Sequence, residues 1–258
     1  AFAAPARAPA GAGAGPGEPD ATAPAAQPCE VSVAKNVALF RPSASWNPIT
    51  AFVAGFLDGF YNKYTTMQLL RGRAPPGADG EPGEVLARGT GLDYIGINHY
   101  FNQVVGAFGA SVAHEPDSVR SDMGWSLRPE TLYEVLATYH AFAPSLPILI
   151  TEHGCADAEV PDARRVAFLE RSLLALRLAV RDHSVRVLGY LHWALIDNFE
   201  WADGFDPRFG LFRVDWDSPG LERNVTQGGL RYAEIIRAND AAWGLAPIAA
   251  EEADGAGG

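Results

Sequence analysis

The 258-residue sequence has few cysteines, few basic residues and no long apolar run. Its two cysteines, Cys29 and Cys155, are too few and too far apart for a disulfide scaffold or a zinc site. A net charge of −11 disfavours binding to nucleic acid or to anionic membranes. No uncharged segment approaches the ~20 residues of a membrane-spanning helix, and no signal peptide is visible. We therefore expect a soluble chain without a metal site, a nucleic-acid partner or a membrane partner, and the sequence predicts no particular compartment.

Composition divides the chain into three parts. Residues 1–30 consist mainly of Ala, Pro and Gly without apolar periodicity, so we expect them to be disordered. Residues 246–258 are rich in Glu, Asp, Gly and Ala and are expected to form a flexible tail. The folded part should be residues 31–245. Because the sequence begins at Ala1 without a methionine, we expect it to belong to a longer chain.

Strand-like and helix-like segments alternate from Val31 onward. Strands are predicted at 31–40, 92–98, 147–151 and 185–193, with a further extended piece at 209–216. Helices are predicted from Asn47-Pro48 towards Gly72, from Pro129, from about Asp162, and over 226–239. In the first helix Phe52, Phe56 and Phe60 share one apolar face.

Four consecutive βα units favour a parallel sheet, either doubly wound or part of a (β/α)₈ barrel. No G-x-G-x-x-G or P-loop follows a strand, which disfavours a nucleotide-binding doubly wound sheet. A complete barrel needs about 250 residues and eight units. The prediction is therefore an α/β chain that supplies about four βα units, half of a TIM barrel.

Polar and aromatic residues follow the predicted strands, where parallel α/β sheets place their ligands. These positions are Asn36, 98–100, 152–154, Trp193 and 197–201. Carboxylates interleaved with Trp and Tyr are typical of a sugar site, and glycoside cleavage uses two carboxylates. By position alone, Glu152 fits a helix cap or a loop ion pair as well as it fits a catalytic carboxylate.

The local sequences add a resemblance. Ile150-Thr151-Glu152-His153-Gly154 is similar to the Thr-Glu-Asn-Gly nucleophile motif of glycoside hydrolase family 1, the β-glucosidase-like enzymes. Segment 189–201 (GYLHWALIDNFEW) resembles the sugar-binding signature of that family, and 204–211 continues it. Segment 93–100 (DYIGINHY) resembles the strand of that family that ends in Asn-Tyr-Tyr, and segment 33–36 (VAKN) resembles the strand before it. The resemblance covers about 31–240 and corresponds to the second half of the family's barrel.

The resemblance implies a role for each matching residue and no cofactor. Glu152 would be the nucleophile that forms a covalent glycosyl-enzyme, Tyr100 would donate a hydrogen bond to it, and Asn98 would order the site. Trp193 would lie under the sugar ring, and Trp201 would donate its N–H to a hydroxyl. The 4- and 6-hydroxyls would bind to Glu200, and Phe209 would close the wall near the 6-position.

The substrate implied is a neutral β-glycoside such as a β-D-glucoside, because a 6-phosphate would repel the Glu200 carboxylate. His99 and His192 are expected to be satisfied structural histidines, and Asp197 and Asn198 to shape their loop.

The sequence departs from the family at two places. The Asn-Glu-Pro motif that carries the family's acid/base is absent, and Glu115-Pro116 lacks the Asn and lies in a predicted loop. His153 stands where the family has Asn, so an imidazole could change how Glu152 is held.

Two functions follow as alternatives: a retaining β-glycosidase that acts within a longer chain, or a catalytically inactive sugar-binding protein. A third possibility is a half-barrel that assembles with another chain, the missing N-terminal half. Half a barrel has two unpaired strand edges, so we expect the isolated chain to be poorly soluble, oligomeric or partly unfolded.

Overall fold

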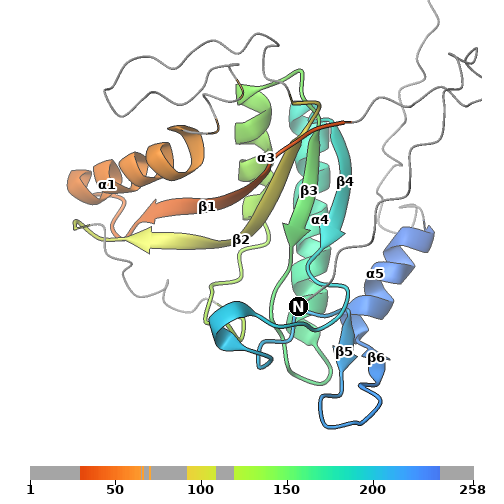
Figure 1. The fold of residues 1–258 in the computed structure, drawn as a ribbon. Helices are drawn as coiled ribbons and strands as arrows, with labels where there is room; N and C mark the ends of the chain where they lie inside the picture. Colours follow the sequence, from red (N-terminus) through yellow and green to blue (C-terminus); the bar gives the residue numbers. More distant parts are fainter. Residues whose placement is uncertain (1–29, 65, 67–69, 71–91, 109–118, 239–258) are drawn as a thin grey trace, which may run out of the picture.

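A four-stranded parallel sheet forms the centre of the protein, seen in a computed structural model that describes residues 30–64, 66, 70, 92–108 and 119–238 (Figure 1). The strands lie in chain order: β1 (Ala34–Pro42), β2 (Ile95–Val105), β3 (Ile148–His153) and β4 (Val187–His192). The predicted parallel βα architecture is confirmed. β2 runs on to Val105, seven residues beyond the end of the strand predicted at 92–98.

Each strand is followed by a helix, as the periodicity predicted. These helices are α1 (Pro48–Asp58), α3 (Thr131–Phe142), α4 (Ala163–His183) and, after β4, α5 (Gln227–Ala238). Asn47 caps α1 by accepting a hydrogen bond from the Ile49 N–H at 2.9 Å, and Pro48 takes the first helical position. α1 continues into a π-helical turn, η1 (Gly59–Tyr64). The predicted stop at Gly72 lies outside the described residues, as do most of the two terminal segments.

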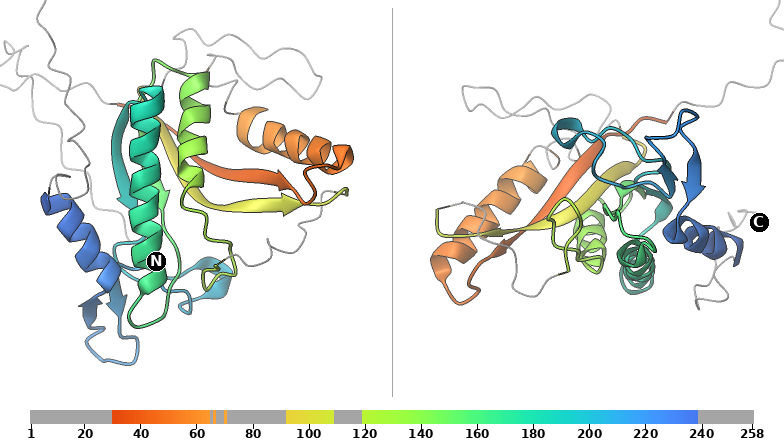
Figure 2. Two further views of the ribbon diagram at one scale, coloured as in Figure 1. Left: turned by 180° about the vertical axis from the view of Figure 1, so that it is seen from behind. Right: turned by 90° about the horizontal axis from the view of Figure 1, so that it is seen from below.

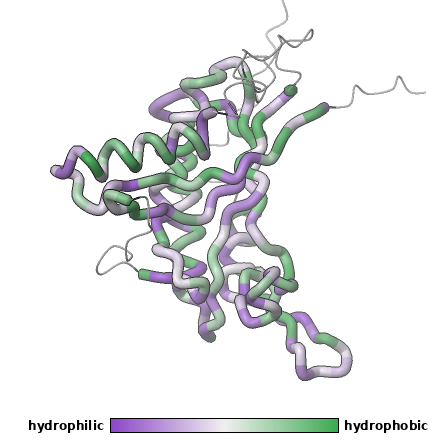
Figure 3. Tube along the Cα trace, turned by 60° about the vertical axis from the view of Figure 1, so that its left-hand side comes forward, coloured by the Kyte–Doolittle hydropathy of each residue, from purple (hydrophilic) through white to green (hydrophobic). Residues whose placement is uncertain are grey.

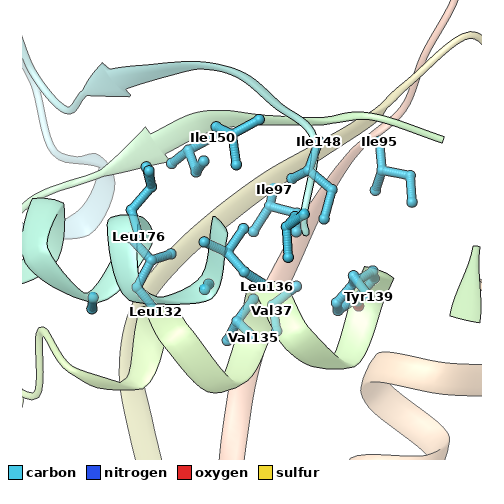
Figure 4. Close-up of a cluster of buried hydrophobic side chains, with 14 of the residues drawn as sticks. Val37, Ile95, Ile97, Leu132, Val135, Leu136, Tyr139, Ile148, Ile150 and Leu176 are labelled. Carbon is cyan, nitrogen blue, oxygen red and sulfur yellow. The ribbon is translucent and has the colours of Figure 1, made fainter. Parts of the chain in front are cut away.

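Helices α3 and α4 cover one face of the sheet, as the view from behind shows (Figure 2). The core lies between them and the strands. Figure 4 shows isoleucines from β2 and β3 directed towards Leu132 and Leu136 of α3 and Leu176 of α4. The buried isoleucines are Ile95, Ile97, Ile148 and Ile150. Burying each such side chain stabilises the fold by about 1.5–3 kcal/mol, so this face holds the sheet together.

The segment between β4 and α5 contains a small second sheet. It contains a 3₁₀ turn, η2 (Trp201–Asp203), and an antiparallel pair, β5 (Phe212–Val214) and β6 (Arg223–Val225). The predicted extended piece at 209–216 thus contains β5, whereas its partner β6 was not predicted. This pair lies beyond the carboxyl end of the central sheet (Figure 1).

The apolar face of α1 lies in solvent. Figure 3 shows hydrophobic residues recurring along this helix. Phe52, Phe56 and Phe60 are 73%, 62% and 67% exposed, and Trp46 in the turn before the helix, Ile49 and Tyr64 are exposed as well. We call these six residues the α1 row. The row flanks β1, which is an outermost strand of the sheet. None of the described helices is both long and apolar enough to cross a membrane.

Candidate active site

Glu152 reaches the site because the side-chain alternation of β3 breaks just before it. Ile148 and Ile150 face the helices, so strict alternation would send Glu152 to the same side. The pairing register with β2 shifts after Ile97, and that with β4 shifts between Ile150 and His153. Such irregularities re-aim side chains beside active sites. Glu152 is partly exposed and contacts Tyr100 of β2, and its neighbour Thr151 contacts Asn98 of the same strand.

Tyr100 donates a hydrogen bond to Glu152. Its hydroxyl lies 2.5 Å from Glu152 Oε2, within the range of a charge-assisted O–H···O⁻ bond. Burial raises the pKa of Tyr100, and the hydrogen bond and negative charge of Glu152 raise it further. The phenol therefore stays protonated at neutral pH and remains a donor, as the resemblance implied.

Asn98 lies beside this pair. It is the register partner of Glu152 across β2 and β3, and its Oδ1 accepts a hydrogen bond from Thr151 Oγ1 at 2.5 Å. With the oxygen occupied by Thr151, the amide NH₂ of Asn98 can act as a donor. Asn98 and Tyr100 share a face because β2 keeps its alternation there, with His99 buried between them.

The end of β4 brings a second carboxylate close to the first. The Trp193 backbone N–H donates to the His153 carbonyl at 3.1 Å, which fixes Trp193 beside the end of β3. Burial raises the pKa of Glu200, the nearby side chain of Trp193 lowers it, and the charges of Asp203 and Glu152 raise it further. The negative charge of Glu152 therefore acts on Glu200, so the two carboxylates lie near each other.

Phe209 closes one wall of the site. It is 2% exposed and packs with Ala156, Ala194, Tyr100 and Trp193. Its ring meets Tyr100 edge-on, with centroids 6.3 Å apart at 80°. Trp201 differs from the other six predicted residues, because it lies on η2 with 83% of its surface exposed. The structure thus gathers Glu152, Tyr100, Asn98, Trp193, Glu200 and Phe209 and leaves Trp201 at the rim.

His153, whose imidazole could change how Glu152 is held, contacts Tyr190 and Phe168. It is buried on the helix side, where its Nδ1 lies 3.0 Å from the Tyr190 hydroxyl and its ring stacks on Phe168. Burial lowers its pKa, and nearby His99 and His192 lower it further. The neutral ring is therefore a packing element.

The two other histidines near the sheet differ from each other. His99 is satisfied as expected, with contacts to the Val37 carbonyl at 2.8 Å and Thr131 Oγ1 at 2.9 Å. His192 is not, because neither of its buried ring nitrogens has a partner among the described residues. Burial lowers the pKa of His192 to about 3, so it is neutral at physiological pH.

Trp125 was missed by the sequence reading. It belongs to the same cluster, with its ring 5.8 Å from Tyr100 and 6.2 Å from Phe209. It lies in a loop without periodicity, so only its aromatic character next to a glycine could have drawn attention to it. Within the described ranges no group of three or more His, Cys, Asp or Glu could hold a metal ion.

Carboxylates, an amide and indoles lie together at the carboxyl ends of parallel strands, the place where α/β barrels carry their ligand sites. Comparison with known proteins agrees. The profile of glycosyl hydrolase family 1 matches residues 21–241, and the chain belongs to that family. The resemblance found in the sequence is confirmed.

Relatives and solved structures give the extent of the match. Beta-glucosidase A of Acetivibrio thermocellus is 30% identical over 162 residues, which cover 57% of this chain and 36% of that protein. A beta-galactosidase of Sulfolobus acidocaldarius is 36% identical over 57% of this chain and 32% of its own length. The galactolipid galactosyltransferase SFR2 of Arabidopsis thaliana is 38% identical over 57% and 23%.

Among solved structures, the beta-glucosidase of Thermotoga maritima in complex with glucoimidazole matches with a TM-score of 0.69 and 25% identity. A beta-glycosidase of Pyrococcus horikoshii matches with a TM-score of 0.70 and 27% identity. Each match covers 81% of this chain, but only 51% and 48% of the two enzymes. The chain thus spans about half of the solved enzymes and about a third or less of these curated relatives.

Proposed function

We propose that this chain carries the nucleophile side of a retaining β-glycosidase that acts on β-D-glucosides. The hydrogen bond from Tyr100 to Glu152 carries the proposal, because it holds one carboxylate oxygen at the strand end. The other oxygen, Oε1, would attack the anomeric carbon. A bond from C1 to Glu152 would form as the bond from C1 to the leaving oxygen breaks, and water would then release the sugar.

The remaining groups would bind the sugar. Trp193 would cover its apolar face, while Glu200 and Asn98 would hydrogen-bond its hydroxyls. The same groups would serve the alternative, a sugar-binding protein without catalysis. The alternative is favoured by one observation, the absence of the Asn-Glu-Pro motif from the sequence. A catalytic test therefore decides between the two.

We expect the chain to hydrolyse 4-nitrophenyl β-D-glucoside and to leave its 6-phosphate uncleaved. A phosphate adds about two negative charges next to Glu200. The measurement is release of nitrophenolate from both compounds and from the β-galactoside. Binding of glucose without release of nitrophenolate would favour the sugar-binding alternative, and preference for the 6-phosphate would contradict the assignment of Glu200.

We further propose that a second set of four βα units, the N-terminal half of a family 1 barrel, completes this one. The solved relatives are about twice as long as the matched part. The outer edges of β1 and β4 end the sheet, and the α1 row adjoins β1. Each phenylalanine of that row would contribute about 1.5–3 kcal/mol on burial.

The isolated chain should therefore self-associate through the α1 row. Replacing Phe52, Phe56 and Phe60 with serine should lower the sedimentation coefficient towards that of a monomer, measured by analytical ultracentrifugation over a range of concentrations. Leu174→Ser with Ile236→Ser is the control, since both residues are exposed on other helices. A monomeric wild-type chain with a sharp cooperative melt would contradict the proposal.

A further inference from the structure

Arg165 is a fully buried arginine outside the sugar-facing residues. It lies near the start of α4, and its side chain is 0% exposed. Its guanidinium donates hydrogen bonds to three backbone carbonyls: those of Gly210, Arg208 at 2.6 Å and Asp157 at 2.7 Å. The Asp162 carboxylate lies 3.6 Å away. A buried charge destabilises the fold unless it is paired. Loss of these hydrogen bonds would therefore be unfavourable, and the three carbonyls are held in place.

Asp197 holds the same segment from the opposite side. This residue is 3% exposed, and its Oδ1 accepts the Gly210 N–H at 2.8 Å. Its Oδ2 accepts the Val214 N–H and Arg208 Nη1, both at 3.2 Å. A Cβ atom added to Gly210 would lie 2.3 Å from the Phe212 carbonyl oxygen and 2.7 Å from Asp197 Oδ1. The backbone of Gly210 is therefore held by Asp197 at its N–H and by Arg165 at its carbonyl.

Phe209 lies between Arg208 and Gly210, two of the three residues whose carbonyls Arg165 binds. Its own carbonyl accepts the Ala194 N–H at 3.1 Å, and the Leu211 N–H donates to the Ala194 carbonyl at 2.9 Å. Since Ala194 follows Trp193, this pairing connects two walls of the site. The Phe209 ring packs against Tyr100, which donates to Glu152.

We propose that Arg165 and Asp197 are positioning residues that hold Phe209 and Trp193 against the Tyr100–Glu152 pair. This inference rests on the proposed function, because the positions matter for attack by Glu152. Neither side chain is placed to touch substrate. Arginine suits the role because its fixed fork reaches three diverging carbonyls, whereas a lysine ammonium is a single point charge.

The core between the sheet and α3 is a separate cluster from the one that contains Phe209. Loss of the Arg165 bonds should therefore loosen the site walls while that core stays intact. Arg165→Lys and Asp197→Asn test this, with Arg181→Lys as the control. Arg181 is on the same helix, is 67% exposed and pairs with Asp182.

Two readouts are compared on the full chain below its melting temperature. The first is amide hydrogen exchange in peptides spanning 193–212 and in α3. The second is covalent labelling by 2-deoxy-2-fluoro-β-D-glucosyl fluoride, resolved into a saturation constant and a limiting rate. In labelling, a Glu152 oxygen bonds to C1 as the C1–F bond breaks and fluoride leaves, so no acid is needed.

In both test variants, exchange at 193–212 should rise while α3 stays protected. The limiting rate of labelling should fall about 10–100-fold, as expected for small misplacements of reacting groups, with Arg181→Lys unchanged. A folded variant that labels like wild type would overturn the proposal, as would global unfolding of both variants. A wild-type chain that never labels Glu152 would instead overturn the proposed function, and exchange at 193–212 would still test the positioning.

Discussion

The Glu152→Ala chain is expected to lose hydrolysis of 4-nitrophenyl β-D-glucoside by about 10³-fold or more. The substitution removes the atom that would bond to C1, so no covalent intermediate could form. Its partner Tyr100 and the neighbouring Asn98 are expected to stay in place, because β2 and β3 are held by their buried isoleucines. The measurement is the initial rate of nitrophenolate release, with a thermal melt to show that the variant folds.

Glu234→Ala is the matched control for this substitution. Glu234 is 60% exposed on α5, far in sequence from the site, and pairs with Arg231 on the surface. Exposed ion pairs of this kind contribute about 0–1 kcal/mol to stability, so activity should not change. Equal turnover by wild type and Glu152→Ala would show that Glu152 is not the nucleophile.

Turnover by this chain should depend strongly on the leaving group. The sequence has no Asn-Glu-Pro motif, and general acid–base assistance is typically worth about 10²–10⁴-fold. Alkyl β-D-glucosides need a proton on the departing oxygen, whereas 4-nitrophenolate leaves without one. We expect the rates for the two substrates to differ by about that factor when the chain is assayed alone.

Azide provides the complementary measurement. Release of the sugar from Glu152 requires a nucleophile, and water needs a base whereas azide does not. Sodium azide should therefore accelerate turnover of the aryl glucoside, with a C1–N bond forming as the bond from C1 to Glu152 breaks. Formation of β-glucosyl azide is detected by NMR. Equal rates for alkyl and aryl glucosides without an azide effect would show that an acid/base group already operates in this chain.

The regular elements could be predicted because their signals are local. The short apolar run at 147–151 predicts a buried strand, and Asn47-Pro48 predicts the start of a helix. Both elements are found. The gathering of Tyr100, Asn98 and Glu152 was also predictable, because carboxyl ends of parallel strands share one edge of the sheet. Their motifs then supplied the family.

Other features depend on tertiary structure and left no local signal. The turn of Glu152 away from the helices follows from register shifts with both neighbouring strands. Trp125 joins the site only through packing. Arg165 looks like an ordinary charged residue of an amphipathic helix, yet it is fully buried because distant backbone carbonyls surround it.

The most direct test of the account is to identify the residue that becomes glycosylated. The chain is incubated with 2-deoxy-2-fluoro-β-D-glucosyl fluoride, digested, and sequenced by tandem mass spectrometry. We predict one added fluoroglucosyl group, located on Glu152 and absent from Glu152→Ala. A label on another carboxylate, or an unlabelled wild-type chain under the same conditions, would contradict the claim that Glu152 is the nucleophile of this site.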